Sequence, residues 1–131
     1  MPQNPPLTVQ PIMQIRPGYC AIAALAMLLG VPYRQVSNAA LKIHKKIHTR
    51  GMRTKEMERV AKALGVTLAG REIAEIDDET GLLLLYRGRS DAHVVLLFRG
   101  VVYDPADGCL WDPDAYCTTR NWKIAGLLEV R

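Results

Sequence analysis

Cys20 is placed where a nucleophile would be useful. It follows the turn signal Pro17-Gly18 and opens an apolar run that ends at Gly30, so we expect it in the first turn of a helix. That turn presents unpaired backbone N–H groups and the positive end of the helix dipole, which both favour a thiolate over a thiol. The same N–H groups can hold the oxyanion of a tetrahedral intermediate. Taken alone, however, a cysteine in an apolar helix is more often a small buried hydrophobic residue.

A nucleophilic cysteine needs an imidazole, and the chain offers three histidines. His93 opens the apolar segment HVVLLF, whereas His44 and His48 lie in the basic stretch KIHKKIH, which is typical of a solvated helix face. The spacing of His44 and His48 could suit a metal ion, but the glutamate of an HExxH motif is absent. His93 is therefore the candidate base, and no metal site is predicted.

Asp104 is the candidate for the group that orients the imidazole. If Arg99-Gly100 forms a two-residue hairpin loop, Val95 lies opposite Asp104. Side chains alternate between faces along a strand, so His93 and Asp104 then share one face as diagonal neighbours, about 7–8 Å apart. We expect Asp104 to accept the Nδ1–H of His93. By themselves, these two residues fit a strand-end histidine and a turn-forming Asp-Pro equally well.

Gln14 precedes Cys20 by six residues. Its side-chain amide could lie beside the helix start and donate a second hydrogen bond to an oxyanion. An isolated glutamine is more often a surface residue, so this assignment depends on the other candidates.

The elements that would position these residues fall into two groups. Residues 1–11 contain four prolines and are expected to be extended, and residues 12–16 form a short strand or extended lead-in. A helix that is apolar on every side is expected to begin at Tyr19 or Cys20 and to stop at Gly30. Two more helices are expected over about 33–48 and from an N-cap at Thr54 to a stop at Gly65. Strands are expected over 66–70, 81–88, 93–98, 101–105 and 122–130, with 81–88 central because it is apolar on both faces. Helices first and antiparallel strands afterwards is the α+β pattern.

The whole chain has the features of an ordinary globular protein. Its 131 residues predict one domain over residues 1–131. The net charge of +4 permits an acidic or nucleic-acid partner without requiring one. Three cysteines without a CxxC pair argue against a disulfide framework and a structural zinc site. We find no signal peptide, and the apolar run is shorter than the about 20 residues that span a bilayer, so we expect a cytoplasmic protein with reduced thiols.

Together these residues resemble the bacteriocin-processing, or double-glycine leader, peptidases, which are papain-like cysteine proteases. The family pattern is a Gln, a Cys that opens an Ala/Leu-rich helix, then a His on an apolar strand, a hairpin, and Asp-Pro with a Gly soon after. Here these parts are Gln14, CAIAALAMLLGVP and HVVLLFRGVVYDPADG, and GMRTKEMERVAKALGV is similar to the helix ahead of the family's sheet. The resemblance covers roughly residues 12–108.

The resemblance implies a papain-like fold in which the nucleophile at a buried helix start packs on a C-terminal antiparallel sheet. It implies that Cys20 is the nucleophile, His93 its base and Asp104 the orienting group, with Gln14 and the Cys20 backbone N–H forming the oxyanion hole. We expect a protein or peptide substrate and no cofactor. The family domain is commonly attached to a membrane exporter, but no transmembrane segment or ATPase motif is found here, so we expect a stand-alone domain.

Two positions depart from the family pattern. The family usually has Gly directly after the Cys and often an acidic residue before it, whereas this chain has Ala21 and Tyr19. The methyl group of Ala21 could crowd the substrate carbonyl. A catalytically inactive peptide-binding module of the same fold is therefore one alternative function. A deamidase or acyl transferase that uses the same triad is another.

The remaining features are less specific. The stretch KIHKKIHTRGMRTK could bind phosphates, but it lacks interleaved aromatic residues and any nucleic-acid motif. A solvated helix and loop is favoured over nucleic-acid binding, and the stretch could instead steer an acidic substrate. Residues 109–117, with Cys109, Cys117 and two aspartates, are interpreted as a loop. Trp111 is a candidate for the wall of a substrate groove, and Tyr86, Tyr103 and Trp122 are expected in the core or the cleft wall.

Overall fold

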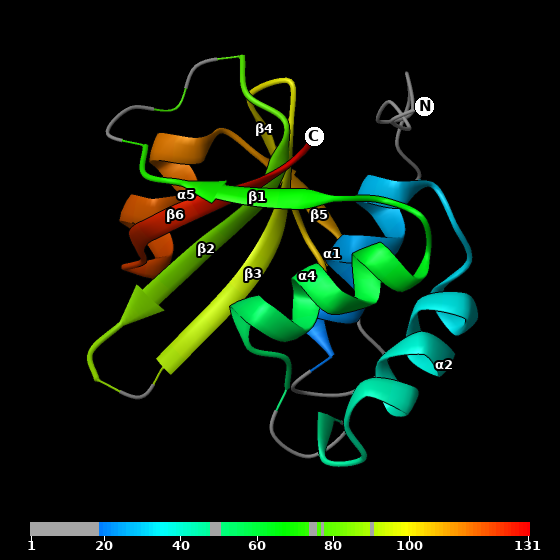
Figure 1. Cartoon of the computed structure of the whole chain (residues 1–131). Coiled ribbons are helices and arrows are strands. Elements are labelled where there is room, and N and C mark those ends of the chain that lie inside the picture. Colours follow the sequence, from blue (N-terminus) through cyan, green and yellow to red (C-terminus); the bar gives the residue numbers. More distant parts are fainter. Residues whose placement is uncertain (1–18, 48–50, 74–75, 77, 90) are drawn as a thin grey trace.

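The computed structural model describes residues 19–131 except 48–50, 74–75, 77 and 90 (Figure 1). This part of the chain contains four helices and a six-stranded antiparallel sheet. The α+β class predicted from the sequence is confirmed. The predictions for residues 1–16, including Gln14, lie outside the described residues.

Helix α1 (Cys20–Leu29) is the central helix of the molecule. Every residue after Cys20 is buried, as expected for a helix that is apolar on every side. The helix ends at Gly30, whose φ of 66° lies in the left-handed region that glycine adopts without strain. Both ends of α1 therefore match the sequence prediction.

Helices α2 (Tyr33–Ile43) and α4 (Thr54–Ala63) pack beside α1. Helix α2 ends five residues before the predicted end at His48. The backbone of His44 is extended and Ile47 is fully buried, so the chain turns after Ile43 to bring Ile47 into the core. The N-cap of α4 is Arg53 and not Thr54, and the Arg53 N–H donates to Glu56 Oε1 at 2.9 Å.

The sheet has the strand order β1-β6-β2-β3-β4-β5. Strand β2 is central, as its apolar sequence predicts, and it pairs with β6 on one side and β3 on the other. The strands are β1 (Leu68–Arg71), β2 (Gly81–Arg87), β3 (Asp91–Phe98), β4 (Val101–Asp104), β5 (Cys109–Trp111) and β6 (Lys123–Val130).

The interpretation of residues 109–117 as a loop is wrong. These residues contain β5 and most of helix α5 (Pro113–Arg120). Asp112 caps α5 by accepting the Ala115 N–H at 3.0 Å, and Pro113 follows at the first position. A capping residue followed by proline is a standard start of a helix, so the signal was present in the sequence.

Helices cover both faces of the sheet (Figure 1). Helix α1 contacts β3. The larger core cluster lies between α1 and one face of the sheet, which contributes residues such as Leu82 and Leu96. The second core cluster joins the other face to Tyr116 of α5 through residues such as Leu83 and Val95. Alternate residues of β2 and β3 thus enter different cores, which explains why residues 82–85 and 94–98 are all apolar.

The β3–β4 hairpin has the predicted register. Phe98 pairs with Val101, and Leu96 pairs with Tyr103. Arg99 and Gly100 both have positive φ, 49° and 78°, which is the backbone of the tight turn that matches the twist of a two-stranded ribbon. This register decides which residues of β3 and β4 share a face.

Candidate active site

Cys20 is the first residue of α1 and is partly exposed, unlike the nine residues that follow it. Tyr19, directly before it, is buried and stacks on Tyr33 with the ring centroids 6.4 Å apart. Its carbonyl accepts the first hydrogen bond of the helix, from the Ala23 N–H. The packing of Tyr19 therefore fixes where α1 begins and presents the thiol at the positive end of the helix dipole.

His93 and Asp104 are joined by a hydrogen bond of 2.8 Å between Nε2 and Oδ1. Both side chains are largely buried, at 12% and 2% exposure. The prediction that they share a face is confirmed, but the predicted ring nitrogen, Nδ1, is wrong. Nε2 is the nitrogen farther from the backbone, so it is the one that reaches the diagonal neighbour on β4. This leaves Nδ1 available for the cysteine.

Asp104 accepts two further hydrogen bonds. The Ala106 N–H donates to Oδ1 at 2.9 Å, and the Tyr116 hydroxyl donates to Oδ2 at 3.0 Å. Burial alone would raise the pKa of Asp104, but the hydrogen bonds from His93, Ala106 and Tyr116 and the charge of His93 hold it below its usual value. Asp104 is thus an ionised carboxylate fixed in orientation.

Tyr116 is a site residue that the sequence analysis missed. It is fully buried in α5, where burial and the neighbouring Asp104 raise the pKa of its hydroxyl, so it stays a proton donor. A buried tyrosine usually needs a hydrogen-bond partner, but the helix around Tyr116 had to be recognised before that rule could be applied.

The electrostatics of His93 connect it to Cys20. Burial lowers the pKa of His93, but hydrogen bonds with Asp104 and with Cys20, together with the charges of both, raise it to about 9. The ring is therefore an imidazolium at neutral pH. The fold thus brings Cys20, His93 and Asp104 together from α1, β3 and β4.

Trp122 covers the ring of His93. The two rings stack with their centroids 5.5 Å apart and an angle of 22° between them. The Arg87 guanidinium lies 4.1 Å from the Trp122 ring centroid and is itself held by Asp91 and by the Arg120 carbonyl. This stacking restricts the access of water to the His93–Asp104 pair.

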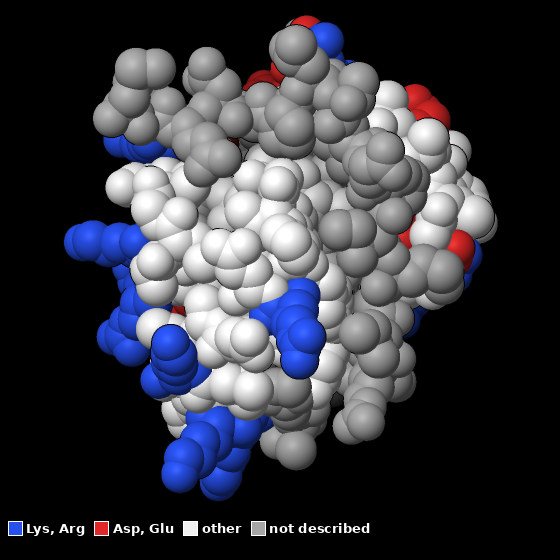
Figure 2. All heavy atoms as spheres, turned by 90° about the vertical axis from the view of Figure 1, so that its right-hand side faces the viewer, with Lys and Arg blue, Asp and Glu red and all other residues white. Residues whose placement is uncertain are grey.

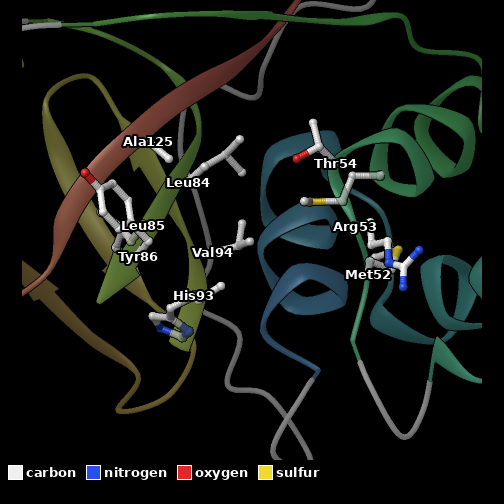
Figure 3. Close-up of a pocket in the computed structure, with 11 residues that line it drawn as sticks. Met52, Arg53, Thr54, Leu84, Leu85, Tyr86, His93, Val94 and Ala125 are labelled. Atoms are coloured by element: carbon white, nitrogen blue, oxygen red, sulfur yellow. The ribbon is translucent and has the colours of Figure 1, made fainter. Parts of the chain in front are cut away.

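A cavity of about 540 Å³ adjoins His93 (Figure 3). Residues of β2, β3 and β6 form one wall, and α4 with the two residues before it forms the other. Trp111 is not among the lining residues; its Nε1–H donates to Asp107 and its ring packs on Tyr116. The lining residues are Met52, Arg53, Thr54, Met57, Leu84, Leu85, Tyr86, Ala92, His93, Val94 and Ala125.

Ala21 does not line this cavity. It is 2% exposed and belongs to the larger core cluster. Its methyl group therefore packs inside the molecule, which removes the reason for expecting it to crowd a substrate at Cys20.

Of the other candidates, only His44 lies in the described part of the chain. His44 is exposed and lies beyond the end of α2, where its Nδ1 accepts the Lys46 N–H, and His48 and Gln14 lie outside the described residues. In the part of the chain that the structure describes, no group of three or more His, Cys, Asp or Glu residues could hold a metal ion. No helix among these residues is long and apolar enough to cross a membrane.

The model of the peptidase C39 family matches residues 8–86, more than half of the sequence. The chain belongs to the peptidase C39 family. The matched segment includes Cys20 and ends before His93, so the histidine and the aspartate are located here by the fold alone. The family predicted from the sequence is confirmed.

Solved structures support the same fold. One is a double-glycine motif protease from an AMS/PCAT transporter, crystallised in complex with the leader peptide. It is 22% identical to this C39 chain, and the match covers 98% of this chain and 94% of that one with a TM-score of 0.66. None of the curated proteins matches. The predicted papain-like arrangement is thus confirmed.

Proposed function

We propose that this protein is a cysteine peptidase that hydrolyses a peptide bond, with Cys20 as nucleophile, His93 as acid and base, and Asp104 as the orienting group. The observation that carries the proposal is the buried 2.8 Å hydrogen bond between His93 and Asp104, on a histidine that also interacts with Cys20. A helix start, an imidazolium and a fixed carboxylate are the parts that nucleophilic cysteine catalysis needs.

In the acylation step, the Cys20 thiolate forms a bond to the carbonyl carbon, and the electron pair of the C=O bond moves to the oxygen. The Cys20 N–H and the Gln14 amide would stabilise that oxyanion. The imidazolium of His93 gives its Nδ1 proton to the amine as the C–N bond breaks. A thioester on Cys20 and a free amine result.

In the deacylation step, the neutral imidazole takes a proton from a water molecule, whose oxygen attacks the thioester carbon. The C–S bond breaks, the carboxylic acid leaves, and the thiolate–imidazolium pair is restored. The Nε2–H of His93 donates to Asp104 throughout, so the ring keeps its orientation while Nδ1 carries the proton.

The substrate is proposed to be a polypeptide whose residues beside the scissile bond enter the mainly apolar cavity next to His93. The solved double-glycine motif protease was crystallised with a leader peptide, and a peptide of that kind is the first substrate class to test.

Alkylation with iodoacetamide near neutral pH tests the activated thiol. Accessibility favours Cys109, which is exposed, over Cys20, which is partly buried. Burial followed by the charge of Asp114 raises the pKa of Cys117, which slows its reaction. We expect Cys20 to react fastest, and His93→Ala to abolish this advantage. Equal rates at Cys20 and Cys109, or an advantage that survives in His93→Ala, would contradict the proposal.

Turnover is tested with a peptide library and mass spectrometry, with Cys20→Ala as the control. Hydrolysis gives two shorter peptides, a deamidase converts a side-chain amide to an acid, and an acyl transferase joins peptides. Shorter products that require Cys20 would support the peptidase. If peptides bind but remain intact, the protein is the inactive binding module instead.

A further inference from the structure

The charge of this protein is divided unevenly along the chain. Residues 33–64 contain nine lysines and arginines against two glutamates, whereas the rest of the chain contains eight basic residues against eleven acidic ones. A protein with a small net charge can therefore present one strongly positive face.

The described basic residues of this region form what we call the basic surface, and all of them are exposed. Figure 2 looks onto this side of the molecule and shows Lys and Arg side chains along its left and lower parts, with Asp and Glu mainly near its upper and right edges. The basic surface comprises Arg34, Lys42, Lys45, Lys46, Arg53, Lys55, Arg59 and Lys62.

The basic residues of the two halves differ in their partners. Outside residues 33–64, Arg71 of β1, Arg87 of β2 and Arg120 of α5 each form an ion pair with an aspartate or glutamate. On the basic surface, Lys55 pairs with Glu58. Among the described residues, no ion pair with a carboxylate is found for six others: Arg34, Lys42, Lys45, Arg53, Arg59 and Lys62. The charges of these six residues are thus not paired within the described part of the chain.

Arg53 connects the basic surface to the cavity beside His93. It is exposed at the start of α4, and among the described residues that line the cavity it is the only lysine, arginine, aspartate or glutamate (Figure 3). The other lining residues, apart from His93 and Thr54, are apolar or aromatic. A chain leaving the cavity past Arg53 meets the exposed side of α4, which carries Lys55, Arg59 and Lys62.

We infer that the basic surface binds an acidic segment of the polypeptide substrate, while apolar residues of the same substrate occupy the cavity. This inference rests on the proposed function and adds to it the chemistry that the substrate must carry. An acidic segment would be attracted over a distance of about 8–10 Å at moderate salt and then held at Arg53.

Nucleic acid fits the basic surface less well. Single-stranded nucleic acid is usually bound by basic grooves with interleaved aromatic rings. Residues 34–62 contain no Phe, Tyr or Trp, and the cavity at the edge of this surface is mainly apolar. A polypeptide can present aliphatic side chains to this cavity beside acidic ones, whereas a nucleic acid offers only planar bases, sugars and phosphates.

The test measures binding and does not require catalysis. Two fluorescein-labelled peptides share the same apolar residues, but the glutamates of one are replaced by lysines in the other. Fluorescence anisotropy with the full chain carrying Cys20→Ala gives their affinities. We expect the Glu peptide to bind at least about tenfold more tightly at low salt, which is a typical effect of charge complementarity, and the preference to disappear at about 0.5 M salt.

Charge reversal locates the interaction. Arg53→Glu is expected to weaken the binding of the Glu peptide about tenfold, and Arg53→Gln should give an intermediate loss. Arg99→Glu is the matched control, because Arg99 is an exposed residue of the β3–β4 turn that does not line the cavity. It should leave the affinity within about twofold. Circular dichroism shows whether each variant is folded.

Three results would overturn the inference: equal affinities for the two peptides, an Arg99→Glu effect as large as that of Arg53→Glu, or tighter binding of single-stranded RNA than of the Glu peptide. Its failure is distinguishable from failure of the proposed function. Cleavage of peptides without a preference for acidic residues would contradict only the inference about the acidic segment. Tight binding of the Glu peptide by a protein whose Cys20 is unreactive would contradict only the proposed peptidase activity.

Discussion

At the scale of single residues, Asp104 is the most constrained group in the site. It is 3% exposed and accepts hydrogen bonds from His93, the Ala106 amide and Tyr116. A buried carboxylate is tolerated only when it is paired and hydrogen-bonded. The orientation of the His93 ring therefore depends on the Ala106 amide and on the fully buried Tyr116, which hold the carboxylate in place.

Removing the Tyr116 hydroxyl should weaken the hydrogen bonding of Asp104 without leaving a cavity in the core. Tyr116→Phe keeps the ring and deletes one hydrogen bond to a charged group, at a cost of about 1.5–3 kcal/mol in the free energy of unfolding. Because that hydrogen bond lowers the pKa of Asp104, its loss should move the acid limb of the Cys20 alkylation profile to higher pH. A purely structural role would lower stability and leave the pH profile in place.

The raised pKa of His93 predicts how stability depends on pH. The folded protein holds the proton up to about pH 9, whereas an unfolded histidine loses it near 6.5. The stabilisation from His93 is therefore complete below about pH 6.5 and is lost as the pH rises through 9. It amounts to at most about 3 kcal/mol.

Urea unfolding of the wild type and His93→Gln at several pH values between about 6 and 9.5 measures this contribution. The difference between their unfolding free energies should shrink as the pH increases. Two curves that stay parallel over this range would show that the folded and unfolded states hold the His93 proton equally.

At the scale of elements, the site depends on how β2 packs between β6 and β3. Strand β2 pairs with β3, where Leu85 lies opposite His93, and with β6 on its other side. Any displacement of β2 is therefore transmitted to the strand that carries the imidazole. Gly81, at the start of β2, is packed closely against β6.

Gly81→Ala should disturb the packing of β2 against β6. The added Cβ would overlap the Leu128 carbonyl oxygen and lie 3.0 Å from Leu127 Cδ1, so the strands must separate at a cost of about 3 kcal/mol. Gly88→Ala is the control, because its Cβ meets open space and only its positive φ of 67° costs about 1–2 kcal/mol. Thermal unfolding and the Cys20 alkylation rate should both change more in Gly81→Ala, and equal effects would contradict this account.

At the scale of the whole molecule, the two cores have different tasks. The core between α1 and the sheet holds the cysteine helix beside β3, and the core under α5 holds Tyr116 against Asp104. The site lies where these two packings meet. The charge is divided in a similar way, since the basic helices lie on one side and most of the carboxylates lie outside them. The proposed catalysis and the proposed attraction of an acidic substrate would thus depend on different parts of one fold.

The sequence by itself determined what local chemistry can determine. The start and end of α1, the central position of β2 and the register of the β3–β4 hairpin follow from apolar patterns, a capping glycine and a two-residue turn. These short-range signals were sufficient to identify Cys20, His93 and Asp104 as candidates and to place two of them on one face.

Only the tertiary structure decided how the candidates are joined. The choice of Nε2 over Nδ1, the hydrogen bond of the Tyr116 hydroxyl and the stacking of Trp122 depend on contacts between side chains of different elements. The burial of the Ala21 methyl and the end of α2 at Ile43 depend on how the helices pack. Such contacts are set by the packing of whole layers, which local patterns along one chain do not encode.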